Sequence, residues 1–187
     1  MNFVKRFFDI VISFLALIIL IIPFIIIGII SLCKQGRPVI IKQKRYGRYG
    51  KIFNIYKFRT MYKDTPTMAS NDVSEANITR WGRILRKSSI DELPQLFNVL
   101  IGEMSIIGPR PLIIEEEEAH QLRLEKGVYK VKPGITGWAQ INGRDNIDTE
   151  EKIELDKYYV ENRSFAFDMK ILFRSFSAVA TGKDIKK

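Results

Sequence analysis

The chain has 187 residues, which suits one domain with a hydrophobic core and one additional element. Its formal net charge of +9 points to a polyanionic partner, such as phosphate groups, nucleic acid or an anionic membrane surface. Because Cys33 is the only cysteine and His120 the only histidine, one chain cannot build a disulfide framework or a cysteine–histidine zinc site. A histidine-based triad would have to use His120, which lies in a highly charged helical stretch.

An uncharged apolar run over residues 10–33 predicts a membrane anchor near the N-terminus. A straight helix of about 24 residues would be about 36 Å long, enough for a hydrocarbon core of about 30 Å. Pro23 divides the run into halves of about 17 Å, because proline removes a helical hydrogen bond. Cations flank both ends of the run, which favours both ends in the cytoplasm and therefore a re-entrant hairpin. A kinked helix that crosses the bilayer stays open as the alternative.

The region after the anchor predicts a mixture of strands and helices. Residues 38–43 and 51–58 are rich in β-branched and aromatic side chains and flank a glycine-containing turn, which indicates a β-hairpin. Lys57 and Arg59 are two residues apart, so we expect both cations on one side of the second strand. After a polar linker, residues 78–87 have the spacing of an amphipathic helix.

Two adjacent carboxylates, Asp91 and Glu92, lie at the start of the next predicted helix. Ser88 and Ser89 each precede one of them by three residues, which is the pattern of a capping box. Pro94 then fits within about the first turn. Consecutive helical residues point about 100° apart, so one carboxylate could attack a substrate while the other holds a metal. The alternative is that both simply cap a helix.

Two further motifs are suited to binding phosphate. Pro109 and Pro111 hold the backbone around Arg110, which limits the entropy lost when this arginine binds an anion. The forked donors of arginine fit phosphate oxygens. The glycine-rich residues 132–143 allow close approach of the backbone to a ligand, or form a surface turn, and Arg144 ends them. An apolar stripe within residues 165–176 indicates either a core helix or one lying in a membrane interface.

Together these motifs resemble the bacterial sugar transferase family, the monotopic phosphoglycosyl transferases, in one order over nearly the whole chain. Besides the kinked apolar N-terminus, they are Lys57-Phe58-Arg59-Thr60-Met61, Asp91-Glu92-Leu93-Pro94-Gln95-Leu96-Phe97-Asn98-Val99, Gly108-Pro109-Arg110-Pro111, and Pro133-Gly134-Ile135-Thr136-Gly137 followed by Asn142-Gly143-Arg144. One departure is Ile22, because small members of this family carry serine before the anchor proline. Without that hydroxyl, a carbonyl freed at the break needs another partner.

The resemblance implies transfer of a sugar-1-phosphate from a UDP-sugar to polyprenyl (undecaprenyl) phosphate, which gives polyprenyl diphosphate sugar and UMP. By motif position, Asp91 would form a covalent aspartyl-phosphosugar intermediate and Glu92 would bind Mg²⁺. The candidate substrate-binding residues are Lys57, Arg59, Arg86, Arg110 and Arg144. Asp156 is a lesser candidate that reads equally well as a member of a structural ion pair. The reaction would be the first membrane step of a bacterial surface-glycan or glycoconjugate pathway, at the cytoplasmic face of the inner membrane.

The expected fold is therefore mixed α+β. Residues 37–187 would form a compact cytoplasmic catalytic domain with a short β-hairpin and several amphipathic or interfacial helices. Residues 1–36 would form a re-entrant membrane helix broken at Pro23. The expected partners are the UDP-sugar, the polyprenyl phosphate and the lipid bilayer, with no nucleic acid; a homo-oligomer and downstream glycosyltransferases are further candidates. The competing function is a non-catalytic, membrane-anchored basic adaptor that binds anionic lipid or nucleic acid, which would leave Asp91 and Glu92 without a purpose.

Overall fold

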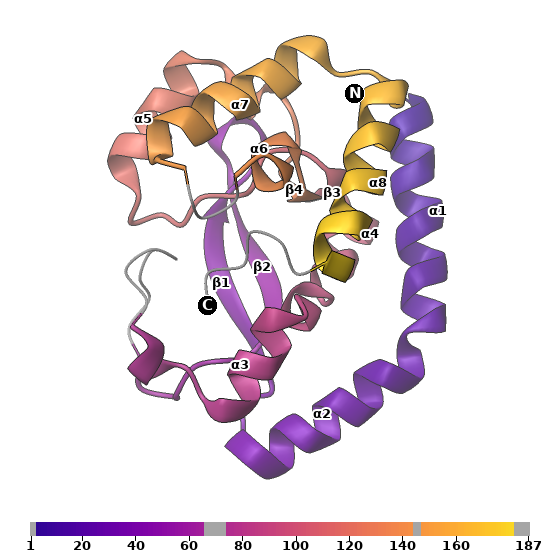
Figure 1. Ribbon diagram of the computed structural model, residues 1–187, viewed down its shortest axis with the longest axis vertical. Coiled ribbons are helices and arrows are strands. Elements are labelled where there is room, and N and C mark those ends of the chain that lie inside the picture. Colours follow the sequence, from indigo (N-terminus) through magenta and orange to yellow (C-terminus); the bar gives the residue numbers. More distant parts are fainter. Residues whose placement is uncertain (1–2, 66–73, 144–146, 182–187) are drawn as a thin grey trace.

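A computed structural model describes residues 3–65, 74–143 and 147–181 of the chain, and it confirms a mixed α+β fold (Figure 1). The helices are α1 (Phe3–Ile19), α2 (Ile21–Gln35), α3 (Arg80–Lys87), α4 (Gln95–Ile101), α5 (Glu117–Glu125), α6 (Trp138–Ile141), α7 (Thr149–Asn162) and α8 (Phe165–Thr181). The strands are β1 (Ile40–Tyr46), β2 (Ile52–Phe58), β3 (Ser105–Ile107) and β4 (Gly134–Thr136). Short 3₁₀ turns cover Arg48–Gly50, Glu75–Asn77, Ile90–Glu92 and Val128–Lys130.

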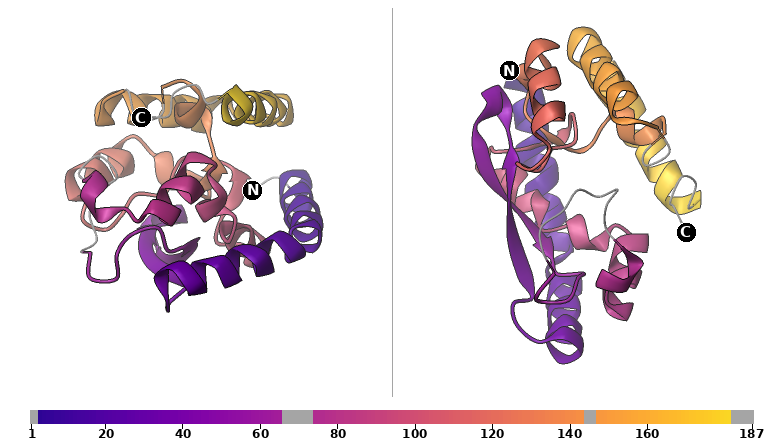
Figure 2. Two further views of the ribbon diagram at one scale, coloured as in Figure 1. Left: turned by 60° about the horizontal axis from the view of Figure 1, so that its bottom comes forward. Right: turned by 90° about the vertical axis from the view of Figure 1, so that its left-hand side faces the viewer.

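The strands form two separate two-stranded sheets. β1 and β2 make the predicted antiparallel hairpin, with Ile41 opposite Lys57, and this hairpin lies along one outer edge of the molecule (Figure 2, right). β3 and β4 pair in parallel, with Ser105 opposite Gly134. The first strand extends three residues further than the predicted 38–43, because its end also bonds to a later segment: Tyr46 N donates to the carbonyl of Leu112.

The apolar N-terminus forms two helices bent by 60° with respect to each other. Pro23 lies in the first turn of α2, while the bend itself lies at Leu20. Proline cannot bond to the carbonyl four residues earlier, which belongs to Ile19, and α1 ends at that residue. Among the described residues no single helix is long and apolar enough to cross a membrane, but the bent pair together could do so by length and composition.

Polar contacts attach α1 to the rest of the protein. The Arg6 guanidinium donates to the carbonyls of Val99 and Leu100 at the end of α4, at 2.7 and 2.9 Å. The buried Asp9 carboxylate accepts from Ser105 Oγ and Ile106 N, both at 3.0 Å. Figure 2 shows α1 and α2 on one side of the molecule and α7 and α8 on the other. The main core lies between these layers and consists of Phe53, Ile55, Leu96, Val99, Met104, Ile106, Ile107, Tyr159 and Ile171.

Candidate active site

The two adjacent carboxylates lie in the 3₁₀ turn Ile90–Glu92, between α3 and α4. The predicted capping boxes are wrong. The Ser88 hydroxyl donates to the carbonyls of Ile84 and Leu85 and so belongs to the end of α3. Ser89 has a left-handed backbone (φ 55°), and its side chain makes no capping hydrogen bond. The left-handed backbone at Ser89 ends α3 and starts the separate turn Ile90–Glu92. α4 begins only after Pro94.

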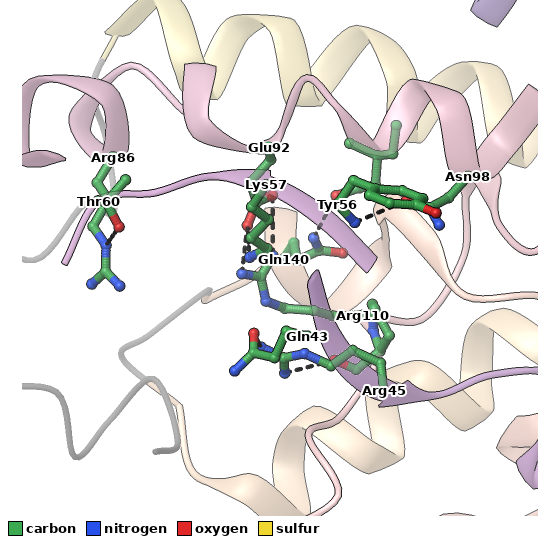
Figure 3. A network of polar contacts seen from close by, with 12 residues as sticks. Gln43, Arg45, Tyr56, Lys57, Thr60, Arg86, Glu92, Asn98, Arg110 and Gln140 are labelled. Carbon is green, nitrogen blue, oxygen red and sulfur yellow. Dashed lines mark hydrogen bonds and ion pairs between the residues drawn. The ribbon is translucent and has the colours of Figure 1, made fainter. Parts of the chain in front are cut away.

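Glu92 is held by two cations from different elements (Figure 3). Lys57 of β2 places Nζ 2.9 Å from Glu92 Oε1, and Arg110 places Nη2 2.7 Å from the same oxygen and Nη1 3.3 Å from Oε2. Burial alone would raise the pKa of Glu92, but Arg110 and Lys57 hold it well below its ordinary value. Glu92 is therefore an anion, already bound on both oxygens.

Asp91 has a different environment from its neighbour. It is 8% exposed. Burial raises the pKa of Asp91, and the negative charge of Glu92 raises it further. Three cations, Lys57, Arg86 and Arg110, oppose part of this shift. A buried carboxylate of raised basicity that lies close to several cations is suited to act as a nucleophile.

Arg86 reaches the site from α3. Its Nε donates to Thr60 Oγ1 at 3.0 Å, just beyond the end of β2 (Figure 3). Lys57 of β2 and Arg110 of the 108–111 motif thus contact Glu92, and Arg86 of α3 lies near enough to lower the pKa of Asp91. The family resemblance and its motifs named these residues as candidates, but only the structure shows where they lie relative to the acidic pair.

Arg59 does not join this group. Its side chain is 5% exposed and donates to the carbonyls of Gln35, Gly36 and Arg37 at the end of α2. β2 ends at Phe58, so the alternation that would place Arg59 beside Lys57 stops there. The expectation that both cations lie on one side is wrong. Arg144 lies outside the described residues.

The backbone of the Arg110 segment is held by two buried arginines that the sequence did not single out. Arg123 of α5 donates to the carbonyl of Arg110 at 2.6 Å, and Arg45 of β1 donates to the carbonyl of Pro111 at 3.2 Å. Arg123 also pairs with the buried Asp156, which makes Asp156 part of a structural ion pair. Only the long-range contacts reveal these roles, because neither arginine belongs to a local motif.

Asn98 attaches the helix after the acidic pair to the hairpin. Its fully buried amide accepts from Tyr56 N at 3.1 Å and donates to the carbonyl of Asn54 at 2.7 Å, as a neighbouring strand would do. A second hydrogen bond from its amide reaches Glu103. These contacts fix α4 against β2, the strand that carries Lys57.

The acidic pair supplies carboxylates of the kind that bind magnesium together with a substrate phosphate. No group of three or more His, Cys, Asp and Glu side chains that could hold a metal occurs in residues 3–65, 74–143 and 147–181. Mg²⁺, however, is commonly bound through one or two carboxylates together with substrate phosphates. Asp91 and Glu92 offer such carboxylates side by side. A metal on Glu92 requires Lys57 or Arg110 to move toward the bound phosphates.

Comparison with known proteins gives one family. The family described as Bacterial sugar transferase matches residues 1–182. The uncharacterized sugar transferase EpsL of Bacillus subtilis is 44% identical over 184 residues, which cover 98% of this chain and 90% of that protein.

Two longer relatives have names that state a reaction. The chain is 38% identical to the undecaprenyl-phosphate galactose phosphotransferase of Salmonella typhimurium, covering 95% of this chain and 40% of the relative. It is 40% identical to the UDP-glucose:undecaprenyl-phosphate glucose-1-phosphate transferase of Escherichia coli, over 90% of this chain and 38% of that enzyme. The chain thus spans about two fifths of the length of these two enzymes.

Proposed function

Since the chain belongs to the bacterial sugar transferase family, we propose that it transfers a sugar-1-phosphate from a UDP-sugar to undecaprenyl phosphate. The products would be undecaprenyl diphosphate sugar and UMP. The observation that carries this proposal is the buried Asp91 beside Glu92, with Lys57, Arg86 and Arg110 arranged around the pair. A site that binds a diphosphate and attacks it needs cations around one anionic nucleophile.

The first step uses Asp91 as the nucleophile. One of its carboxylate oxygens attacks the phosphorus that bears the sugar, and the bond from this phosphorus to the bridging oxygen breaks. UMP leaves with that oxygen and its negative charge, and the enzyme keeps the sugar phosphate as an acyl phosphate on Asp91. Arg110, Lys57 and Arg86 stabilise the charge on the phosphate oxygens during this step.

The second step restores the enzyme. A phosphate oxygen of undecaprenyl phosphate attacks the same phosphorus, and the bond to the Asp91 oxygen breaks. Asp91 returns as a carboxylate, and the product carries a new diphosphate linkage. The two displacements split one difficult transfer into two easier steps.

Glu92 is the residue we propose to hold Mg²⁺. When bound, this ion would neutralise the donor diphosphate and help UMP to leave. Lys57 and Arg110 keep Glu92 ionised before the ion arrives, as the lowered pKa of Glu92 indicates. The same two cations can then turn to the phosphate oxygens.

We further propose that α1 and α2 form a re-entrant hairpin that anchors the enzyme to the cytoplasmic face of the bilayer. Many of their large apolar side chains are exposed, including Phe14, Ile18, Ile22, Ile25 and Ile29, which suits contact with lipid. An enzyme held on one leaflet can reach the head-group phosphate of a lipid acceptor without extracting its chain.

Release of UMP tests the proposal. The full chain in lipid nanodiscs is given UDP-glucose, UDP-galactose or their N-acetylated analogues, with and without undecaprenyl phosphate. We expect sustained UMP release and a lipid-linked sugar only when donor and acceptor are both present. An adaptor would bind anionic vesicles without releasing UMP, and that result would overturn the enzyme assignment.

A further inference from the structure

Arg59 connects the end of α2 to the strand that reaches the acidic pair. Its Nη1 donates to the Arg37 carbonyl at 3.0 Å, and its Nη2 donates to the Gly36 carbonyl at 2.9 Å and to that of Gln35. Carbonyls at the end of a helix have no partner within the helix, and a cation is favourable there. The Arg59 side chain therefore caps α2.

The backbone of Arg59 makes the same connection. Its N–H donates to the Val39 carbonyl at 2.9 Å, and its carbonyl accepts from Gln35 Nε2 at 3.1 Å. The end of α2 and the chain that follows it are thus bonded to one residue through side chain and backbone together. Such a junction leaves little freedom for α2 to move relative to Arg59.

Arg59 belongs to a segment, residues 57–60, that touches the acidic pair and the anchor in turn. Lys57 contacts Glu92, and the Phe58 ring packs against Phe24 of α2 with centroids 5.6 Å apart. Thr60 accepts from the Nε of Arg86 at 3.0 Å. Two of the cations at the acidic pair are therefore placed by this segment.

α3 is fixed to the same junction. Thr79, the residue that caps α3, donates its hydroxyl to Gln35 Oε1 at 2.9 Å, and its N–H donates to the Thr60 carbonyl at 3.0 Å. A Cβ on Gly82 would lie 1.9 Å from the Thr60 carbonyl oxygen, so the helix and the segment are in direct backbone contact. A displacement at the end of α2 must move this helix, which carries Arg86.

We propose that Arg59 is a positioning residue that couples the placement of α2 to the placement of Lys57 and Arg86 at the acidic pair. This inference rests on the proposed function and gives Arg59 a role at the anchor in place of a phosphate contact. It makes the chemistry depend on a correctly placed anchor. The acceptor lipid lies in the bilayer, so a protein detached from it would be a poor catalyst.

Two variants of Arg59 and two controls test the coupling in the full chain, in nanodiscs. Arg59→Gln removes the cation, and Arg59→Lys keeps the charge but cannot span the three carbonyls. Arg80→Gln removes an exposed cation of α3. Ser31→Ala removes a different contact of α2, the hydrogen bond that Ser31 Oγ accepts from Trp81 Nε1 at 2.8 Å. This change does not alter residues 57–60.

Two measurements are made on each variant. Hydrogen exchange of the amides at residues 33–36 reports the end of α2. Steady-state UMP release from UDP-glucose and UDP-galactose, with undecaprenyl phosphate, reports kcat and KM. For Arg59→Gln we expect exchange to be about tenfold or more faster and kcat about tenfold or more lower, with KM for the UDP-sugar within about threefold of wild type. Arg59→Lys should fall between Arg59→Gln and wild type in both measurements.

The outcomes separate the roles. A raised KM for the UDP-sugar with unchanged exchange would make Arg59 a phosphate contact. Faster exchange with unchanged kcat would make it only a cap of α2. Either result overturns the coupling. An equal loss of kcat in Ser31→Ala would show a general need for the anchor and would also overturn the specific role. If Arg59→Gln fails to fold, Arg59→Lys decides by the same criteria. Wild-type UMP release in the same assay separates failure of this inference from failure of the proposed function.

Discussion

The Arg110 guanidinium donates to both carboxylate oxygens of Glu92, at 2.7 and 3.3 Å. This two-point contact uses the fixed fork of arginine, and the backbone carbonyl of Arg110 accepts a hydrogen bond from Arg123 at 2.6 Å. Arg110 is 43% exposed on its side chain, while Glu92 is 17% exposed. The arginine can therefore turn toward a phosphate that enters from solvent while its backbone stays in place.

Arg110→Lys should be damaging although the charge is kept, because an ammonium group cannot make the forked contact. We expect a loss of about 1–3 kcal/mol of transition-state stabilisation, measured as kcat/KM for the UDP-sugar. The exposed Arg80→Lys is the matched control. Wild-type kinetics in Arg110→Lys would show that Arg110 is only a surface cation.

Asp91→Asn should abolish turnover while leaving the fold intact, since the amide is not an anionic nucleophile. A loss of at least about 100-fold in kcat is expected. The exposed Asp64→Asn serves as the control, and intact mass spectrometry checks that the asparagine has not deamidated to aspartate. Substantial residual activity in undeamidated protein would mean that Asp91 does not attack the substrate.

Glu92→Gln should also lose activity, but through the metal. The neutral amide binds Mg²⁺ weakly, so the Mg²⁺ concentration that gives half-maximal UMP release should rise. Removal of the ion from wild type with a chelator should stop the reaction, and added Mg²⁺ should restore it. An unchanged Mg²⁺ dependence in a Glu92→Gln variant that retains measurable activity would contradict the proposed ligand.

As the pH is lowered, kcat should begin to fall at a higher pH than it would if Asp91 had the pKa of an ordinary aspartate. Burial and Glu92 raise the pKa of Asp91, and the nucleophile is lost as the pH drops through that raised value. Arg86 opposes this shift, so Arg86→Gln removes a positive charge and should move the acidic limb to still higher pH. Profiles of kcat against pH for wild type, Arg86→Gln and Arg80→Gln provide the measurement. If the acidic limb of the profile does not move in Arg86→Gln, Arg86 does not influence the pKa of the group that titrates.

The proposed hairpin places both ends of the α1–α2 pair in the cytoplasm. Phe3→Cys and Lys34→Cys, each in a Cys33→Ser background, should resist a membrane-impermeant thiol reagent in intact bacteria and react after permeabilisation. Reaction of the Phe3→Cys protein alone from outside would mean that the pair crosses the membrane. Pro23→Ala should increase that crossing form, because one continuous helix becomes possible.

Local sequence patterns predicted the elements well and the contacts between them poorly. The hairpin, α3 and the break caused by Pro23 follow from local chemistry that a few neighbouring residues determine. The predicted position of Arg59 beside Lys57 was wrong because its environment depends on where β2 ends and on where the end of α2 lies. These two segments are separate in the sequence. Arg45 and Arg123 were missed for the same reason: each acts on a carbonyl supplied by a distant segment.

The bond from Arg6 to the end of α4 bears on how this protein can be prepared. The sequence suggests cutting between residues 36 and 37 to obtain a soluble catalytic fragment for crystallisation or inhibitor screening. Such a fragment would lose Arg6, whose guanidinium donates to the carbonyls of Val99 and Leu100 on the helix following the acidic pair. We expect it to be poorly folded and inactive even toward a water-soluble acceptor. Membrane mimetics and the full chain are therefore the appropriate starting material.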